Sequence, residues 1–218
     1  MLTLDSKFSD YIGVLKAAGA CDAVMAFHDK MLDEKPDLTV GDVYKVFQAD
    51  TTFQDAWCEW AMRLIGKDLG EDVRAIIIDK IKTPMTCLRL AYRCPFLSET
   101  EIGSLRSKYE GQGDDVAKAV ICLDAIVKSR EFNLVRVEAV ATCKSVTDAK
   151  SLIESKTDVV TTVSADKAVK SADEIKKILE TERTKVTLAT NEVMRSQGFV
   201  DDKGIGSVSV FESWLEGV

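Results

Sequence analysis

The side chains that could carry acid–base or metal chemistry are few and scattered along this chain. Two pairs of adjacent aspartates, Asp114–Asp115 and Asp201–Asp202, can bind magnesium or exchange a proton only if the fold brings further ligands to them. The single histidine, His28, falls on the apolar face of a helix expected over 21–32, where a buried, hydrogen-bonded imidazole is commoner than a catalytic one. No stretch is typical of a nucleotide loop, a metal cluster or an activated nucleophile. The sequence therefore favours a protein that binds or assembles, and an enzyme with a carboxylate site built by the fold is a weaker alternative.

The cysteines predict a reducing, cytoplasmic environment. No two of them form a CxxC pair, and most have apolar neighbours, which is typical of buried free thiols. We therefore expect neither a disulfide framework nor a metal or other cofactor. The N-terminal residues lack the pattern of a signal peptide, and no apolar run approaches the roughly 18 residues of a membrane helix, so a membrane partner is not expected. The six cysteines are Cys21, Cys58, Cys87, Cys94, Cys122 and Cys143.

A basic stretch over 74–108 stands out in a chain whose net charge is −7. Lysine and arginine neutralise phosphates, and Tyr92 and Tyr109 can stack on unpaired bases, so this stretch is a candidate nucleic-acid surface. A solvated helical face explains the same residues. The basic residues are Arg74, Lys80, Lys82, Arg89, Arg93, Arg106 and Lys108.

Two groups of aromatic residues are candidates for partner binding. Near the C-terminus, Phe211, Trp214 and Leu215 share one face of a helical turn and are flanked by acidic residues. Such a peptide can insert into the groove of a partner protein or fold back over its own core. Residues Phe53, Trp57, Trp60 and Leu64 also recur at helical spacing. We interpret this stripe as core, with an aromatic platform for a partner as the alternative.

The spacing of apolar residues predicts a mainly α-helical, bundle-like protein. Gly19 is expected to end the first helix, because glycine accepts the left-handed conformation at a helix C-terminus. Thr39 with Asp42, and Ser98 with Glu101, have the spacing of capping boxes that begin helices. Helices are expected over 4–18, 21–32, 40–49, 51–65, 71–82, 85–93, 98–109 and 114–130.

The C-terminal third has a different composition, which suggests a small β or α/β element. Residues 134–142 and 158–163 are rich in β-branched side chains and slightly favour strands over helix. A long helix is expected over 166–197, although 185–190 has strand character, and 207–210 alternates like a strand. We therefore divide the chain into a helical domain, 1–131, and a smaller C-terminal region, 132–218.

The leading hypothesis from the sequence is a non-catalytic interaction or assembly protein that binds other protein subunits, with homo-oligomers as one form. The general character of the sequence fits a viral or phage structural component, located in the cytoplasm or in a virion. The alternative is a nucleoprotein that binds nucleic acid through 74–108.

Overall fold

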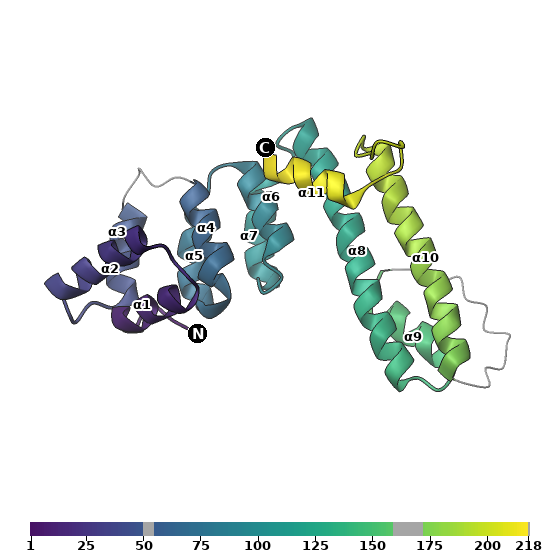
Figure 1. Ribbon diagram of the computed structural model, residues 1–218, viewed down its shortest axis with the longest axis horizontal. Helices are drawn as coiled ribbons and strands as arrows, with labels where there is room; N and C mark the ends of the chain where they lie inside the picture. Colours follow the sequence, from purple (N-terminus) through teal and green to yellow (C-terminus); the bar gives the residue numbers. More distant parts are fainter. Residues whose placement is uncertain (50–54, 159–171, 218) are drawn as a thin grey trace. The chain divides into compact units, whose positions relative to one another are not determined.

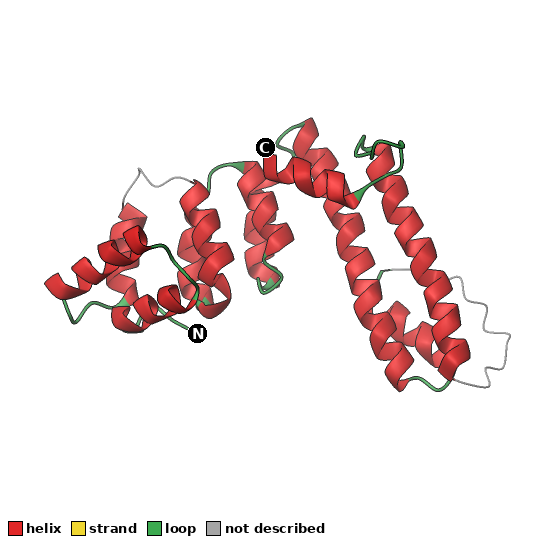
Figure 2. Ribbon diagram, viewed as in Figure 1, coloured by secondary structure: helices red, strands yellow, loops and turns green. Residues whose placement is uncertain are grey.

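The computed structural model describes residues 1–49, 55–158 and 172–217 (Figure 1). Within these residues every regular element is helical: eleven α-helices and one short 3₁₀ helix, with no strand (Figure 2). The mainly α class predicted from the sequence is therefore confirmed. The chain divides into an N-terminal unit, Met1–Val116, and a C-terminal unit, Ala117–Val218. The boundary expected near 131–133 and the division after Val116 both fall within one long helix, Asp114–Thr142.

The N-terminal unit is built from short helices joined by tight connections. The first helix ends as expected at Gly19, whose φ is +76°. The N–H of Gly19 donates to the carbonyl of Lys16, and that of Ala20 donates to Leu15, which is a Schellman arrangement. The elements are α1 (Phe8–Ala17), α2 (Asp22–Glu34), α3 (Val40–Ala49), α4 (Asp55–Ile65), η1 (Gly66–Asp68), α5 (Glu71–Lys80), α6 (Pro84–Arg93) and α7 (Glu99–Tyr109).

Both predicted capping boxes begin helices of this unit. The hydroxyl of Ser98 accepts the N–H of Glu101, and the Glu101 carboxylate accepts the N–H of Ser98 at 2.8 Å. Thr39 and Asp42 make the same reciprocal pair at the start of α3, at 3.1 Å in each direction. The expected start at Thr51, and Phe53 with it, lie outside the described residues.

The segment before α1 ties the starts of α3 and α5 together. The N–H of Gly41 donates to the carbonyl of Leu4 at 2.7 Å, and the N–H of Gly70 donates to that of Leu2 at 2.6 Å. A Cβ atom at Gly41 would lie 2.8 Å from the Leu4 oxygen, so this close approach needs glycine. These contacts fix the starts of α3 and α5 against the segment that precedes α1.

The C-terminal unit contains longer helices around a separate core. Figure 1 shows α9 lying between α8 and α10 at one end of this unit. Phe132, Val135 and Ala139 of α8 bury their side chains there with Ile153 of α9 and Leu179 of α10. An ion pair between Arg136 and Glu180 also joins α8 to α10. The helices are α8 (Asp114–Thr142), which begins in the N-terminal unit, α9 (Val146–Lys156), α10 (Ala172–Ser196) and α11 (Val208–Gly217).

The small β element predicted for the C-terminal third is wrong for the residues that the structure describes. Residues 134–142 belong to α8, 185–190 belong to α10, and 208–210 begin α11. The reason is that buried residues of α8 recur at helical spacings of three and four, and burial of that face outweighs the weak strand preference of β-branched residues. Of 158–163, only Asp158 is described, and it lies outside any helix or strand.

Candidate functional site

The aspartates singled out from the sequence lie in a turn and at the start of a helix. Asp201 accepts the backbone N–H groups of Lys203 and Ile205, both at 2.9 Å, which stabilises a turn. Asp114 and Asp115 are exposed in the first turn of α8. Among the described residues, no group of three or more His, Cys, Asp and Glu side chains is placed to hold a metal ion.

Most of the cysteines are buried free thiols, as expected. Burial raises the pKa of Cys58, Cys87, Cys94 and Cys122 to about 11, so these thiols stay protonated near neutral pH. A protonated thiol is a poor nucleophile and a poor metal ligand. Cys21 is exposed and Cys143 is half-buried.

Two residues of the basic stretch, Arg74 and Lys108, make their hydrogen bonds inside the fold. The Arg74 guanidinium is buried: it donates to both oxygens of Glu101, at 2.7 and 3.0 Å, and to the carbonyl of Leu69 at 2.5 Å. Lys108 donates through Nζ to the carbonyls of Ile78, Asp79 and Ile81 at the end of α5, at 2.6 to 3.0 Å. Both side chains therefore stabilise the fold instead of facing a ligand.

The remaining basic residues differ in exposure. Arg89 is half-buried and pairs with Glu59 at 3.0 Å, and the exposed Arg106 pairs with Glu110 at 3.8 Å. Lys82 is exposed, Arg93 is half-buried, and the ammonium of Lys80 lies 5.6 Å from the centre of the Phe47 ring. Tyr92 and Tyr109 are both buried, so neither ring is available to stack on a base.

The C-terminal aromatic residues lie on α11 and pack within their own unit. Phe211 and Leu215 are buried, and the Phe211 ring makes an edge contact with Phe199, with 5.2 Å between ring centres. Trp214 is half-buried beside the same ring of Phe199, also at 5.2 Å. This is the fold-back arrangement that the sequence left open.

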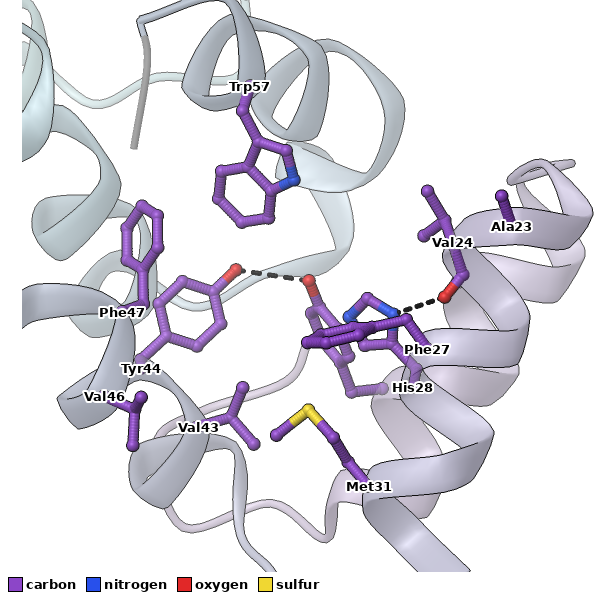
Figure 3. A pocket seen from close by; sticks show the side chains of 11 residues that line it. Ala23, Val24, Phe27, His28, Met31, Val43, Tyr44, Val46, Phe47 and Trp57 are labelled. Carbon is purple, nitrogen blue, oxygen red and sulfur yellow. Dashed lines mark hydrogen bonds between the residues drawn. The ribbon is translucent and has the colours of Figure 1, made fainter. Parts of the chain in front are cut away.

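A pocket of about 430 Å³ in the N-terminal unit is the strongest candidate for a functional site. Its walls come from α1 to α4, and Figure 3 shows Phe27 and His28 facing Tyr44 and Phe47 across it, with Trp57 at one end. Pockets of this size and apolar character are typical of binding sites. We call it the aromatic groove and define it by Tyr11, Phe27, His28, Tyr44, Phe47 and Trp57.

The base of the aromatic groove carries its few polar groups. The hydroxyls of Tyr11 and Tyr44 share a hydrogen bond of 3.4 Å. His28 Nδ1 lies 2.7 Å from the Val24 carbonyl, and because a carbonyl only accepts, Nδ1 carries the proton and donates it. The expectation of a buried, hydrogen-bonded histidine is confirmed. Figure 3 shows the other ring nitrogen, Nε2, pointing away from Val24 toward the side that Tyr44 lines.

The rim of the aromatic groove exposes large apolar side chains. Phe27 on α2 is 63% exposed and Val46 on α3 is 67% exposed. Such side chains beside an apolar pocket mark contact sites, because leaving them in water costs free energy. Neither residue is among the candidate site residues derived from the sequence.

The interpretation of the tryptophan stripe as core is wrong in detail. The buried face of α4 is formed by Cys58, Ala61, Met62 and Ile65, whereas Trp57 and Trp60 are only half-buried. Trp57 lines the aromatic groove, and its ring centre lies 4.7 Å from that of Phe47. The alternative, an aromatic platform for a partner, stays a prediction for Trp57.

Charged groups of both signs lie near the aromatic groove. Lys30 of α2 lies 4.0 Å from Glu34, and the ammonium of Lys80 lies 5.6 Å from the centre of the Phe47 ring. Asp22 and Asp33 of α2 are exposed and do not line the groove.

No protein-family model matches this chain, and comparison with curated proteins and with solved structures finds no match. Among the residues that the structure describes, no helix is long and apolar enough to cross a membrane. The functional proposal therefore depends on the geometry of the aromatic groove.

Proposed function

We propose that this protein is a non-catalytic interaction protein that holds a segment of a partner protein in the aromatic groove. The observation that carries the proposal is the exposure of Phe27 and Val46 on either side of an apolar pocket of about 430 Å³. A partner that covers these side chains removes apolar surface from water, and each square ångström contributes about 25 cal/mol. The partner and the groove then form the apolar centre of an interface.

The polar groups of the groove support binding over catalysis. The two tyrosine hydroxyls bond to each other, and His28 Nδ1 bonds to backbone. A catalytic triad or dyad would need a nucleophile and a base within hydrogen-bond reach of each other and of a substrate. The described residues of the groove include no such pair.

Selection from a displayed peptide library tests this proposal. We expect the enriched peptides to bind wild-type protein and to lose binding, by at least tenfold, to the variants Phe27→Asp and Val46→Asp. Both changed side chains are mostly exposed, so the fold should tolerate them, and circular dichroism melts check this. The matched control is Leu188→Asp, which changes a 62% exposed residue of α10 and should bind normally. Selection that yields no peptide sensitive to both groove variants would contradict the proposal.

An exposed face of α8 supports the assembly part of the proposal. Leu134 is 74% exposed and Val137 is 60% exposed, and Val127 lies seven residues before Leu134. This spacing is that of a coiled-coil seam, so a second copy of the chain can pair along it. Light scattering coupled to size exclusion should show an oligomer for wild-type protein and a monomer for Leu134→Lys. A wild-type monomer at high concentration would remove assembly from the proposal.

Nucleic-acid binding is the weaker alternative, because Arg74 and Lys108 are engaged inside the fold. The same chromatography, with absorbance at two wavelengths, would detect bound nucleic acid, and charge reversal at Arg89 and Arg93 should not alter partner binding. The proposal keeps a cytoplasmic location and a viral or phage origin, which come from the general character of the sequence.

A further inference from the structure

We infer that His28 is a pH-sensitive switch: the neutral side chain holds α2 in the N-terminal unit, and the protonated side chain releases that helix. The release of α2 does not depend on the proposed function. Its effect on binding does rest on that function, because α2 supplies one wall of the aromatic groove.

Helix α2 is held by few buried side chains. Of its 13 residues, only Met25 and His28 are buried. The imidazole packs against two rings of α1: its centre lies 5.7 Å from that of Phe8 and 5.8 Å from that of Tyr11. The attachment of α2 to α1 therefore depends strongly on one ring that can take up a proton.

The hydrogen bond of the imidazole decides where a second proton goes. Since Nδ1 donates its proton to the Val24 carbonyl, the second proton adds to Nε2. Figure 3 shows this nitrogen on the side of the ring that faces Tyr44. His28 is only 8% exposed, and a buried charge without a partner costs free energy. On a released helix the imidazole lies in water and takes the proton without that cost.

The titratable groups that face the ring from neighbouring helices are neutral. Burial raises the pKa of Tyr11 on α1 and of Tyr44 on α3, so both phenols stay protonated near neutral pH. Burial also raises the pKa of Cys58 on α4, which acts on Tyr44, to about 11. None of these groups supplies a negative charge that could pair with an imidazolium.

The charged groups near the groove do not stabilise an imidazolium either. Lys80 of α5 lies beside the Phe47 ring, and its like charge disfavours a second cation. Asp29, which follows His28 on α2, pairs with Lys16 of α1 at 3.5 Å. The described residues that line the groove include no carboxylate. Because the released state binds the extra proton more readily, docking of α2 should weaken as pH falls.

Amide hydrogen exchange tests the switch without any ligand. An imidazole in water gains its proton near about pH 6.5, so exchange is compared at pH 7.5 and pH 5.5 after correction for the intrinsic rate. The amides of α2 should lose protection by about threefold or more at pH 5.5. Helix α6 of the same unit contains no histidine and should keep its protection. Equal protection of α2 at both pH values would overturn the inference.

The variant His28→Asn assigns the effect to this side chain. Its amide N–H can still donate to the Val24 carbonyl but does not titrate, so α2 should keep the same protection at both pH values. A pH dependence that persists in the variant would show that another group causes it. If the variant does not fold, NMR titration of the wild type decides, because the chain has one histidine. Protonation of that ring without loss of α2 protection would overturn the inference.

Binding to the groove gives the last test. Library peptides that depend on Phe27 and Val46, and that contain no histidine, should bind wild-type protein about tenfold more weakly at pH 5.5 than at pH 7.5. In His28→Asn this difference should disappear. Equal binding at both pH values would overturn the switch while the proposed function stands. Absence of any such peptide overturns the proposed function, and hydrogen exchange then decides the switch alone.

Discussion

The hydroxyl oxygens of Tyr11 and Tyr44 lie 3.4 Å apart at the base of the aromatic groove, and both side chains are buried. Burial raises the pKa of Tyr11, against a smaller lowering by its hydrogen bond to Tyr44. Burial also raises the pKa of Tyr44 well above its ordinary value, and the neighbouring Tyr11 adds to this. Each phenol therefore stays protonated in the folded protein at pH values where an exposed tyrosine ionises.

This pair predicts a loss of stability in alkali. Because the folded pKa of each phenol exceeds its unfolded value of about 10, its contribution is fully present below pH 10 and is lost as pH rises through the folded pKa. Urea unfolding between pH 9 and pH 11 should show this decline. Tyr44→Phe removes one titrating group. The fall of the unfolding free energy above pH 10 should therefore be less steep by about 1.4 kcal/mol per pH unit. An unchanged slope would contradict the prediction.

The buried ion pair of Arg74 and Glu101 predicts a large effect of single substitutions. Arg74→Met leaves the Glu101 carboxylate buried without its main partner and should cost about 3–5 kcal/mol in unfolding free energy at pH 7. Arg74→Met with Glu101→Gln removes the charge while keeping an acceptor for Ser98, so part of the loss should return. If the double variant has a lower unfolding free energy than Arg74→Met, the unpaired buried charge is not the cause of the loss in stability.

The stability that the pair of Arg74 and Glu101 contributes depends on pH. Burial alone would raise the pKa of Glu101, but hydrogen bonds from Arg74 and Ser98 outweigh it and lower the pKa. The stability that Glu101 contributes is therefore present above its unfolded pKa of about 4.5 and is lost as pH falls through the lower folded value. The difference between wild type and Arg74→Met should shrink as pH falls below 4.5, which urea unfolding at several pH values measures.

Local signals in the sequence predicted the helix ends well. The Ser98–Glu101 cap and the Gly19 terminus depend on residues within one helical turn, so their chemistry is visible in the sequence. The helical state of 134–142 was missed because it depends on burial against Ile153 and Leu179, which are distant along the chain.

The aromatic groove was missed for a related reason. Periodicity shows that Trp57 and His28 share apolar faces with their neighbours, but it does not show whether another helix covers those faces. That Phe27 is exposed depends on how α1 to α4 pack, which a single apolar stripe cannot specify.

The cysteines should differ sharply in reactivity. Burial raises the pKa of Cys58, Cys87, Cys94 and Cys122 to about 11, so iodoacetamide at pH 8 should leave them unmodified in the folded protein. Cys21 is exposed and should react first. Mass spectrometry after short labelling measures the order, and labelling in urea, where all six thiols should react, is the control. Rapid native labelling of Cys58 would contradict the burial.

Gly206 should be the least replaceable glycine of the C-terminal unit. A Cβ atom there would lie 1.7 Å from the carbonyl oxygen of Asn191 and 2.9 Å from the backbone nitrogen of Arg195, so the loop or α10 must move to accept it. Gly206→Ala should therefore lower the unfolding free energy by ~3 kcal/mol.

The matched control for this substitution is Gly13→Ala in α1, where a Cβ atom meets nothing within 4 Å. Because alanine is the better helix former, this variant should gain up to about 1 kcal/mol. Urea unfolding followed by circular dichroism compares the two substitutions, which add the same methyl group. Equal effects would show that the backbone of Gly206 does not lie against α10 in solution.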